Sequence, residues 1–299
     1  MKNKIEALQN KLKHGVSPAL ATPVTADGYT VNVDLIPTLI EFLESKGSKG
    51  LFVGGSTGEG ILLTIDERKR LHKTAAEAAS VPVMLHIGAN RTDTAVALAN
   101  HAAQIGADAI AAVTPYYYGF HDEGLINYYQ AISQAAPELP LLLYDIPHMA
   151  VNGISPAFIK EVQEKVPTIA GIKTSRGNMI EINALLKAAA PPFITFAGKE
   201  PLALGALSYG FDGLVSGLST AIPEPFVALT AAYGAGDLQA AQAHQQTVNR
   251  LLTCIPAGYR IGTIKQILAE RGFAVGTAVP PRPMPHEPIW PSMQAILES

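Results

Sequence analysis

The chain has 299 residues, of which 48% are hydrophobic and 16% charged, and its formal net charge is −3. This composition suits a large globular core and excludes a disordered or low-complexity protein. Because Lys and Arg (22 residues) nearly balance Asp and Glu (25 residues), we expect neither a nucleic acid nor a membrane surface as partner.

At the N-terminus, residues 1–15 mix Lys, Glu, Gln and Leu and lack the apolar run of a leader peptide. Nowhere does an apolar stretch reach the length that a membrane span needs. The single cysteine, Cys254, cannot form an intrachain disulfide. We therefore expect a cytoplasmic protein.

Short apolar runs bounded by Gly, Pro or Thr follow one another along the chain and predict strands buried on both faces. They lie at 16–21, 50–55, 82–87, 109–113, 140–144, 168–173, 193–197 and 212–216. Segments with helical spacing alternate with them, at 66–80, 92–104, 178–190 and 223–233. The spacing of about 30 residues per unit is typical of βα repeats.

This alternation predicts an α/β protein, a (β/α)8 TIM barrel, that occupies residues 1–235 together with a short N-terminal segment. No GxGxxG follows the first predicted strand, which disfavours a doubly wound open sheet. Helical patterns at 237–254 and 260–270 predict a C-terminal helical extension, residues 236–299, packed on the barrel.

Reactive residues at the ends of barrel strands are candidates for catalysis. Lys173 ends the sixth predicted strand, where poor solvation favours the free amine that attacks a carbonyl carbon. Its alternative is a lysine that extends to solvent or pairs with an acidic neighbour. Tyr144 ends the preceding strand, where its hydroxyl could shuttle protons or its ring could simply pack at the rim.

Two loops add polar and aromatic groups. The run GGSTGE at 54–59 permits a tight turn whose amides and hydroxyls can hold a carboxylate, although a plain capped turn is the alternative. A phosphate cradle would need a following Gly-Lys-Ser/Thr. The tyrosines at 116–118 favour rim packing or a subunit contact. The eight histidines are scattered, so we expect no metal.

Four motifs occur in order and at barrel intervals: GGSTGE at 54–59, VTPYYY at 113–118, LYDIP at 143–147 and GIKTS at 171–175. Together they resemble the dihydrodipicolinate synthase / N-acetylneuraminate lyase family of pyruvate-dependent class I aldolases, over nearly the whole chain. The resemblance implies a homotetramer, a dimer of dimers, that needs no cofactor. It also implies four catalytic residues: Lys173, Tyr144, Thr57 and Tyr117. Lys173 would form the imine and Tyr144 would transfer protons. Thr57 and Tyr117 would complete a proton relay, with Tyr117 reaching across the tight-dimer contact.

The substrate-binding residues implied by the resemblance are Ser56, Thr57, Val215, Ser175, Gly198, Glu200 and Met149. Ser56 and Thr57 would hold the keto-acid carboxylate. Met149 stands where the synthase branch has an arginine for its second substrate. Glu200 is all that remains of the acidic pair with which the sialic acid lyase branch reads the sugar-acid tail. Asp145 replaces the more usual Asn, with an effect that the sequence leaves open.

We therefore expect a Schiff-base lyase whose partner is a small pyruvate-like 2-keto acid and which reversibly cleaves or dehydrates a 2-keto-3-deoxy sugar acid. The alternatives are 4-hydroxy-tetrahydrodipicolinate synthase or N-acetylneuraminate lyase activity, and a non-catalytic keto-acid-binding regulatory protein. A phosphate-binding barrel enzyme is disfavoured, because the glycines at 210–217 have no cation beside them. The residues expected to choose the substrate are His148, Met149, Lys199, Glu200 and Ser219.

Overall fold

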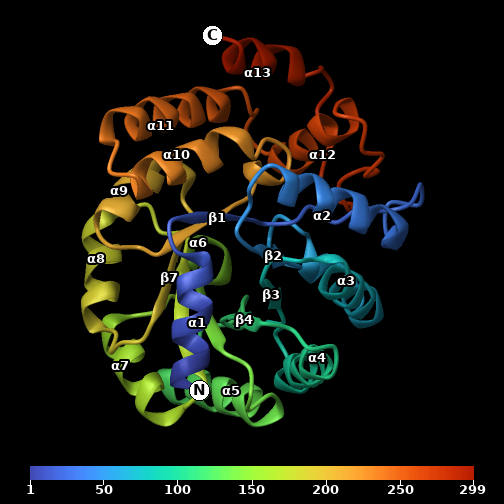
Figure 1. The fold of residues 1–299 in the computed structure, drawn as a ribbon. Helices are drawn as coiled ribbons and strands as arrows, with labels where there is room; N and C mark the ends of the chain where they lie inside the picture. The colour runs from blue at the N-terminus through green and yellow to red at the C-terminus, as the bar shows by residue number, and fades with distance from the viewer.

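The computed structural model describes residues 1–299 and has eight parallel strands in a nearly closed barrel (Figure 1). The strands are β1 (Gly15–Pro18), β2 (Leu51–Val53), β3 (Val83–His86), β4 (Ala109–Val113), β5 (Leu141–Asp145), β6 (Ile169–Thr174), β7 (Ile194–Ala197) and β8 (Gly213–Ser216). They pair in the order β1-β8-β7-β6-β5-β4-β3-β2. The predicted (β/α)8 TIM barrel is confirmed.

The first predicted strand is too long at its end, because after Ala19, whose amide still donates to the Ser216 carbonyl of β8, the backbone turns toward β2. Ala19 forms a parallel bridge with Phe52, and the Leu20 amide donates a hydrogen bond to the Phe52 carbonyl. These contacts complete the ring between β1 and β2.

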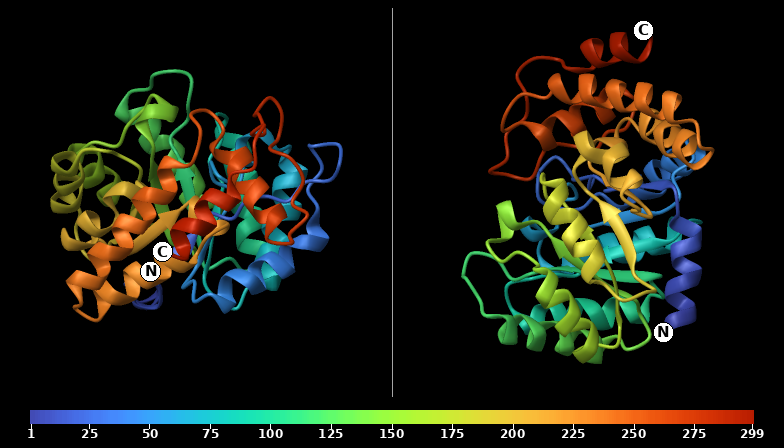
Figure 2. Two further views of the ribbon diagram at one scale, coloured as in Figure 1. Left: turned by 90° about the horizontal axis from the view of Figure 1, so that it is seen from above. Right: turned by 90° about the vertical axis from the view of Figure 1, so that its left-hand side faces the viewer.

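Helices that follow the successive strands cover the outside of the barrel (Figure 2). They are α2 (Ile36–Ser45), α3 (Ile65–Ala78), α4 (Thr92–Gln104), α5 (Asp122–Ala135), α7 (Pro156–Lys165), α8 (Met179–Ala188), α9 (Ala203–Ser208) and α10 (Glu224–Gly234). The predicted helix at 92–104 coincides with α4, and the other three differ from α3, α8 and α10 by one or two residues at each end. Side-chain caps set two of these starts, at Thr64 before α3 and Asn178 before α8.

Five shorter helices lie in the loops: η1 (Val33–Leu35), η2 (Gly60–Leu62), α6 (Pro147–Ala150), η3 (Glu200–Leu202) and η4 (Leu218–Thr220). A C-terminal helical part follows α10, made of α11 (Leu238–Thr253), α12 (Arg260–Glu270) and α13 (Trp290–Leu297). Figures 1 and 2 show α11 alongside α10. The division of the chain at residue 236 stays a prediction. None of the helices combines the length and apolar character that a bilayer crossing requires.

The N-terminal segment forms helix α1 (Lys2–Leu12), which the sequence reading did not assign. Ile5, Leu8 and Leu12 lie on one face of α1 and join the apolar cluster of the barrel interior. Leu12 lies against Gly50, at the start of β2, so α1 covers the end of the barrel where the strands begin. The opposite end stays open.

Alternation along the strands separates interior from exterior side chains. On β5, Leu142 and Tyr144 join the interior cluster, whereas Leu141 and Leu143 belong to the larger cluster under the helices. The strand register pairs Tyr144 with Lys173 on β6. Parallel pairing therefore brings these two residues together near the ends of their strands.

Candidate active site

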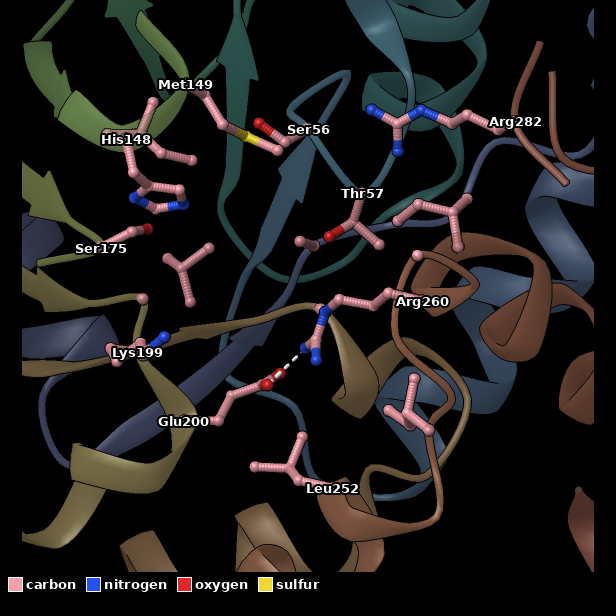
Figure 3. Close-up of a pocket in the computed structure, with 18 of the residues that line it drawn as sticks. Ser56, Thr57, His148, Met149, Ser175, Lys199, Glu200, Leu252, Arg260 and Arg282 are labelled. Carbon is pink, nitrogen blue, oxygen red and sulfur yellow. Dashed lines mark hydrogen bonds and ion pairs between the residues drawn. The ribbon is translucent and has the colours of Figure 1, made fainter. Parts of the chain in front are cut away.

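A cavity of about 650 Å³ opens where the strands end (Figure 3). Its walls include every residue predicted for catalysis or substrate binding except Tyr117: Ser56, Thr57, Tyr144, Met149, Lys173, Ser175, Gly198, Glu200 and Val215. These side chains come from the loops or ends of β2, β5, β6, β7 and β8. The structure thus brings together residues that lie far apart in the sequence.

Lys173 is buried, with only 6% of its surface exposed. Its Nζ donates a hydrogen bond to Ser175 Oγ at 2.8 Å and lies 3.9 Å from the centre of the Tyr144 ring. No carboxylate pairs with this amine. Lys173 is therefore a buried amine with a hydroxyl and an aromatic face as its neighbours, which are surroundings that favour a nucleophilic amine.

The Tyr144 hydroxyl lies 2.9 Å from Ser56 Oγ, and either atom can be the donor. Thr57, which was predicted as the catalytic member of this loop, makes no hydrogen bond with Tyr144. Its Oγ1 instead lies beside Gly217, 2.6 Å from the position a Cβ would take there. The geometry therefore links Ser56, rather than Thr57, to the Tyr144 hydroxyl.

Two interior rings hold Tyr144 from the sides. Phe52 and His86 both meet it edge to face, with centroids 5.6 and 5.5 Å away. His86 Nδ1 lies 2.9 Å from the Gly54 carbonyl oxygen. Complete burial, together with the charge of Arg68, lowers the pKa of His86 to about 3, so the ring is neutral near pH 7.

Gly198 leaves room for the Lys173 side chain. A Cβ at this position would lie 2.5 Å from Ser175 Oγ and 2.6 Å from Lys173 Cε. Any larger residue would push at least one of these side chains away. Gly198 thus lines the cavity because the chain passes so close to the amine.

Glu200 is buried, and its carboxylate already has three partners. Oε1 accepts hydrogen bonds from Ser216 Oγ at 2.7 Å and from the Leu218 amide at 2.8 Å, while Oε2 pairs with Arg260. Burial alone would raise the pKa of Glu200, but the Arg260 charge and these hydrogen bonds outweigh it and lower the pKa. Glu200 is therefore ionised, and both of its carboxylate oxygens have partners within the protein.

Arg260 and Arg282 also line the cavity, and the sequence reading missed both. They come from the start of α12 and from the loop that follows it. No local signal marks them, because neither lies at the end of a strand. The C-terminal helical part brings them to the barrel mouth by long-range packing.

The loop after β5 carries His148 and Met149 into the cavity wall. It contains a strained residue, Val151, with φ 62° and ψ −49°, whose neighbours are joined by a hydrogen bond from the Asn152 amide to the Ala150 carbonyl. Such a turn costs about 1–3 kcal/mol for a side chain with a Cβ. It persists only where surrounding contacts hold it.

Asp145 anchors the chain just beyond this turn. It is fully buried, and its carboxylate accepts hydrogen bonds from the Ile154 amide, from Thr174 Oγ1 and from Arg176. Arg176 also donates to the Ile154 carbonyl. The Asp145–Arg176 pair thus ties the loop after β5 to the end of β6.

Glu59, the last residue of the GGSTGE loop, connects this loop to the C-terminal helical part. Its carboxylate lies 2.8 Å from Lys265 Nζ, and both side chains are fully buried. It also accepts a hydrogen bond from the Val279 amide. The loop after β2 is therefore held by residues from the other end of the chain.

Outside the cavity lie the proposed relay residue Tyr117 and Ser219, which was expected to help choose the substrate. Tyr117 is 77% exposed and has a positive φ of 81°, next to exposed Tyr118. The Asn152 side chain donates hydrogen bonds to the carbonyls of Pro115 and Tyr118 and so fixes this loop. Ser219 is buried and bonds to the Ser216 carbonyl.

Comparison with known proteins is consistent with this geometry. The model of the dihydrodipicolinate synthetase family matches residues 12–298. The 4-hydroxy-tetrahydrodipicolinate synthase of Salinibacter ruber is 36% identical over 265 residues, which cover 88% of this chain and 87% of that protein. The N-acetylneuraminate lyase of Mediterraneibacter gnavus is 29% identical over 289 residues, 95% of this chain and 91% of that protein.

Solved structures agree with the fold. Wild-type sialic acid aldolase from Ruminococcus gnavus superposes with a TM-score of 0.91 at 28% identity, covering 96% of this chain and 98% of that one. YagE from E. coli K12, solved in complex with pyruvate, gives a TM-score of 0.87 at 27% identity, with 95% and 97% of the two chains covered.

Proposed function

The chain belongs to the dihydrodipicolinate synthetase family of class I aldolase-type pyruvate lyases, and we propose that it reversibly cleaves or dehydrates a 2-keto-3-deoxy sugar acid. The observation that carries this proposal is the buried, carboxylate-free amine of Lys173 beside Ser175 and Tyr144. No metal is needed for such a reaction, because a protonated imine supplies the electrophile.

In the proposed mechanism, Lys173 Nζ attacks the keto carbon, and loss of water gives an imine. When the C3–C4 bond breaks, its electron pair moves into the protonated imine and forms an enamine, while the C4 hydroxyl gives its proton to the Tyr144 oxygen and the C4 fragment leaves as an aldehyde. A proton then returns to C3, and water hydrolyses the imine to release pyruvate. Dehydration would instead remove a proton from C3 and hydroxide from C4.

Tyr144 is the proposed proton carrier for these steps. Its hydroxyl reaches Ser56 Oγ, and its ring lies against the Lys173 amine, so it can serve both the carbinolamine oxygen and the leaving hydroxyl. We assign the keto-acid carboxylate to the hydroxyls and amides of Ser56 and Thr57. Val215 and Gly198 would then shape the pocket around the three-carbon keto end.

We also propose a homotetramer in the cytoplasm. The exposed aromatic loop at 116–120 supports a subunit contact, through which Tyr117 would reach a neighbouring site. The free Cys254 supports a reducing compartment.

Two activities of relatives are retained as alternatives. Identity of 36% to a 4-hydroxy-tetrahydrodipicolinate synthase favours the synthase reaction, but a Met149 thioether cannot replace an arginine at a carboxylate. The TM-score of 0.91 to a sialic acid aldolase favours N-acetylneuraminate cleavage, but Glu200 already has its partners.

The first test is to incubate the protein with pyruvate, reduce it with borohydride and measure the mass of the chain and its peptides. We expect one adduct on the peptide that holds Lys173, lost in Lys173→Ala and kept in the control Lys160→Ala. An adduct that survives Lys173→Ala would sink the assignment, and no adduct at all would favour a non-catalytic binding protein. Release of pyruvate from 2-keto-3-deoxy acids and from N-acetylneuraminate, and formation of 4-hydroxy-tetrahydrodipicolinate, then separate the activities.

A further inference from the structure

The cavity is much more positive than the protein around it. Four cationic side chains line it (Lys173, Lys199, Arg260 and Arg282) against one carboxylate, Glu200, although the whole chain carries a formal charge of −3. Lys173 is consumed in forming the imine. A single keto-acid carboxylate needs only one cationic side chain or one set of amide groups to bind it. More positive charge is present than a substrate with a single carboxylate requires.

Glu200 is not free to bind the neutral hydroxyl groups of a substrate. Its two oxygens are occupied by Ser216, Leu218 and Arg260, so a sugar hydroxyl would have to displace one of these partners. Displacement would leave a buried polar group unsatisfied, at a cost of about 1–3 kcal/mol for each lost bond. We therefore expect the side chains around Glu200 to bind the end of the substrate remote from the keto acid.

Lys199 is the first of these side chains. It follows Gly198 at the end of β7, is exposed, and has no hydrogen-bond or ion-pair partner in the structure. Its charge is felt at the cavity wall, since burial and then the charges of Lys199 and Lys173 lower the pKa of His148, which also lines the cavity. Figure 3 shows Lys199 on the same side of the cavity as Glu200.

Arg260 is the second. Its side chain is 41% exposed, and only one of its five N–H groups is engaged, with Glu200. In Figure 3, Arg260 lies over Glu200 on the side away from Lys199. Arg282 is set apart from them, because Glu59 lies 4.0 Å from its Nε and balances part of its charge.

We propose that Lys199 and Arg260 together bind a second anionic group of the substrate, at the end remote from the keto acid. The inference rests on the proposed function, because it places the keto carbon at Lys173. Lys173 is buried, whereas Lys199 and Arg260 are partly open to solvent, so a substrate that extends from the imine toward the mouth meets them with its far end. A terminal carboxylate or a terminal phosphate has the required chemistry.

The test compares two 2-keto acids of equal chain length as imine-forming probes. 2-Ketoadipate carries a terminal carboxylate, and 2-ketohexanoate ends in a methyl group. Borohydride trapping, followed by mass spectrometry, gives the half-saturating concentration of each. We expect the wild-type enzyme to prefer the dianion by at least about tenfold, and the preference to shrink as salt is added.

Lys199→Gln and Arg260→Gln should each reduce that preference several-fold, and the double variant should abolish it. Lys160→Gln, an exposed lysine away from the cavity, is the matched control and should keep it. Equal trapping of both acids by the wild type would overturn the inference while leaving the imine mechanism intact. An equal loss of both acids in Arg260→Gln would also overturn it, because Arg260 would then serve the keto-acid carboxylate beside Thr57.

If no 2-keto acid at all is trapped, the proposed function and this inference are both overturned. A final arm distinguishes the two sources of the anion. A 2-keto-3-deoxy acid with a terminal phosphate is compared with one that has a terminal carboxylate, and the better substrate by kcat/KM identifies the group that the Lys199–Arg260 site accepts.

Discussion

Nε of Arg176 lies 2.7 Å from Oδ2 of Asp145, and Nη2 of Arg176 lies 3.2 Å from Oδ1, so the two side chains form a two-point ion pair. Asp145 is fully buried and directly follows Tyr144. The effect of an aspartate at this position, which the sequence leaves open, is thus a charged link between the loops after β5 and β6. That link is attached to Ile154, three residues beyond the strained Val151.

Asp145→Asn should destabilise the fold and loosen the loop that carries His148 and Met149. It keeps the shape but leaves the Arg176 charge without its main partner, which we expect to lower the free energy of unfolding by roughly 3 kcal/mol. Urea denaturation followed by circular dichroism measures this loss. Asp93→Asn, in the exposed Arg91–Asp93 pair, is the control and should not move the midpoint. Equal midpoints for both variants would contradict the role of Asp145.

Gly198→Ala should impair imine formation without unfolding the barrel. The added methyl group would come within 2.6 Å of Lys173 Cε, so the amine must shift. We expect the rate of pyruvate trapping to fall by at least about tenfold, since small misplacements of a nucleophile have large kinetic effects. Gly205→Ala adds a methyl group in open space and serves as control. Normal trapping in Gly198→Ala would show that the site tolerates the shift.

Ser56→Ala and Thr57→Val separate two roles within one loop. Because Ser56 bonds to the Tyr144 hydroxyl, its loss should lower kcat by about 10²-fold, as should Tyr144→Phe. Thr57→Val should raise KM with little change in kcat, because both residues are proposed to bind the carboxylate but only Ser56 also bonds to the Tyr144 hydroxyl. Steady-state kinetics of pyruvate release measures both constants. The reverse pattern would return the proton relay to Thr57.

Stability should fall in mild acid because His86 is buried in its neutral form. Its pKa is about 3 in the folded protein, against an ordinary value of 6.5. Below about pH 6.5 the unfolded chain therefore binds a proton that the folded chain does not, and the free energy of unfolding falls as the pH is lowered. From pH 7.5 to pH 5.5, this group alone should contribute a loss of about 1.4 kcal/mol.

The check is urea denaturation at both pH values for the wild type, His86→Asn and His286→Asn. His86→Asn should show a weaker pH dependence, and the exposed His286→Asn should match the wild type. His72 is also fully buried, has no hydrogen-bond partner for either ring nitrogen, and has a pKa far below its ordinary value through burial, so some dependence will remain. Identical slopes in all three proteins would refute the assignment to His86.

The part of the site that was predictable from sequence lies on consecutive strands. Tyr144 and Lys173 end successive apolar runs, and parallel strands of a barrel bring such ends together. The same rule places Ser56, Gly198 and Val215 around them. The barrel itself followed from the alternation of runs and amphipathic segments.

The parts that were not predictable depend on packing between distant segments. Helix α1 carries only three apolar positions on one face, and nothing local shows that the barrel end receives them. Arg260 begins a helix whose placement over the mouth is set by the C-terminal part. Likewise, Glu200 reads as a free carboxylate in sequence, because its partners lie at 216, 218 and 260.

The contact between Glu59 and Lys265 has a consequence for how the enzyme is made. A ribosome produces the GGSTGE loop early, but the buried Glu59 carboxylate gains its partners only when Lys265 and Val279 have emerged. Until then the loop that holds Ser56 and Thr57 lacks its support. In a nascent chain, therefore, the support of this loop is completed only after residue 279 has left the ribosome.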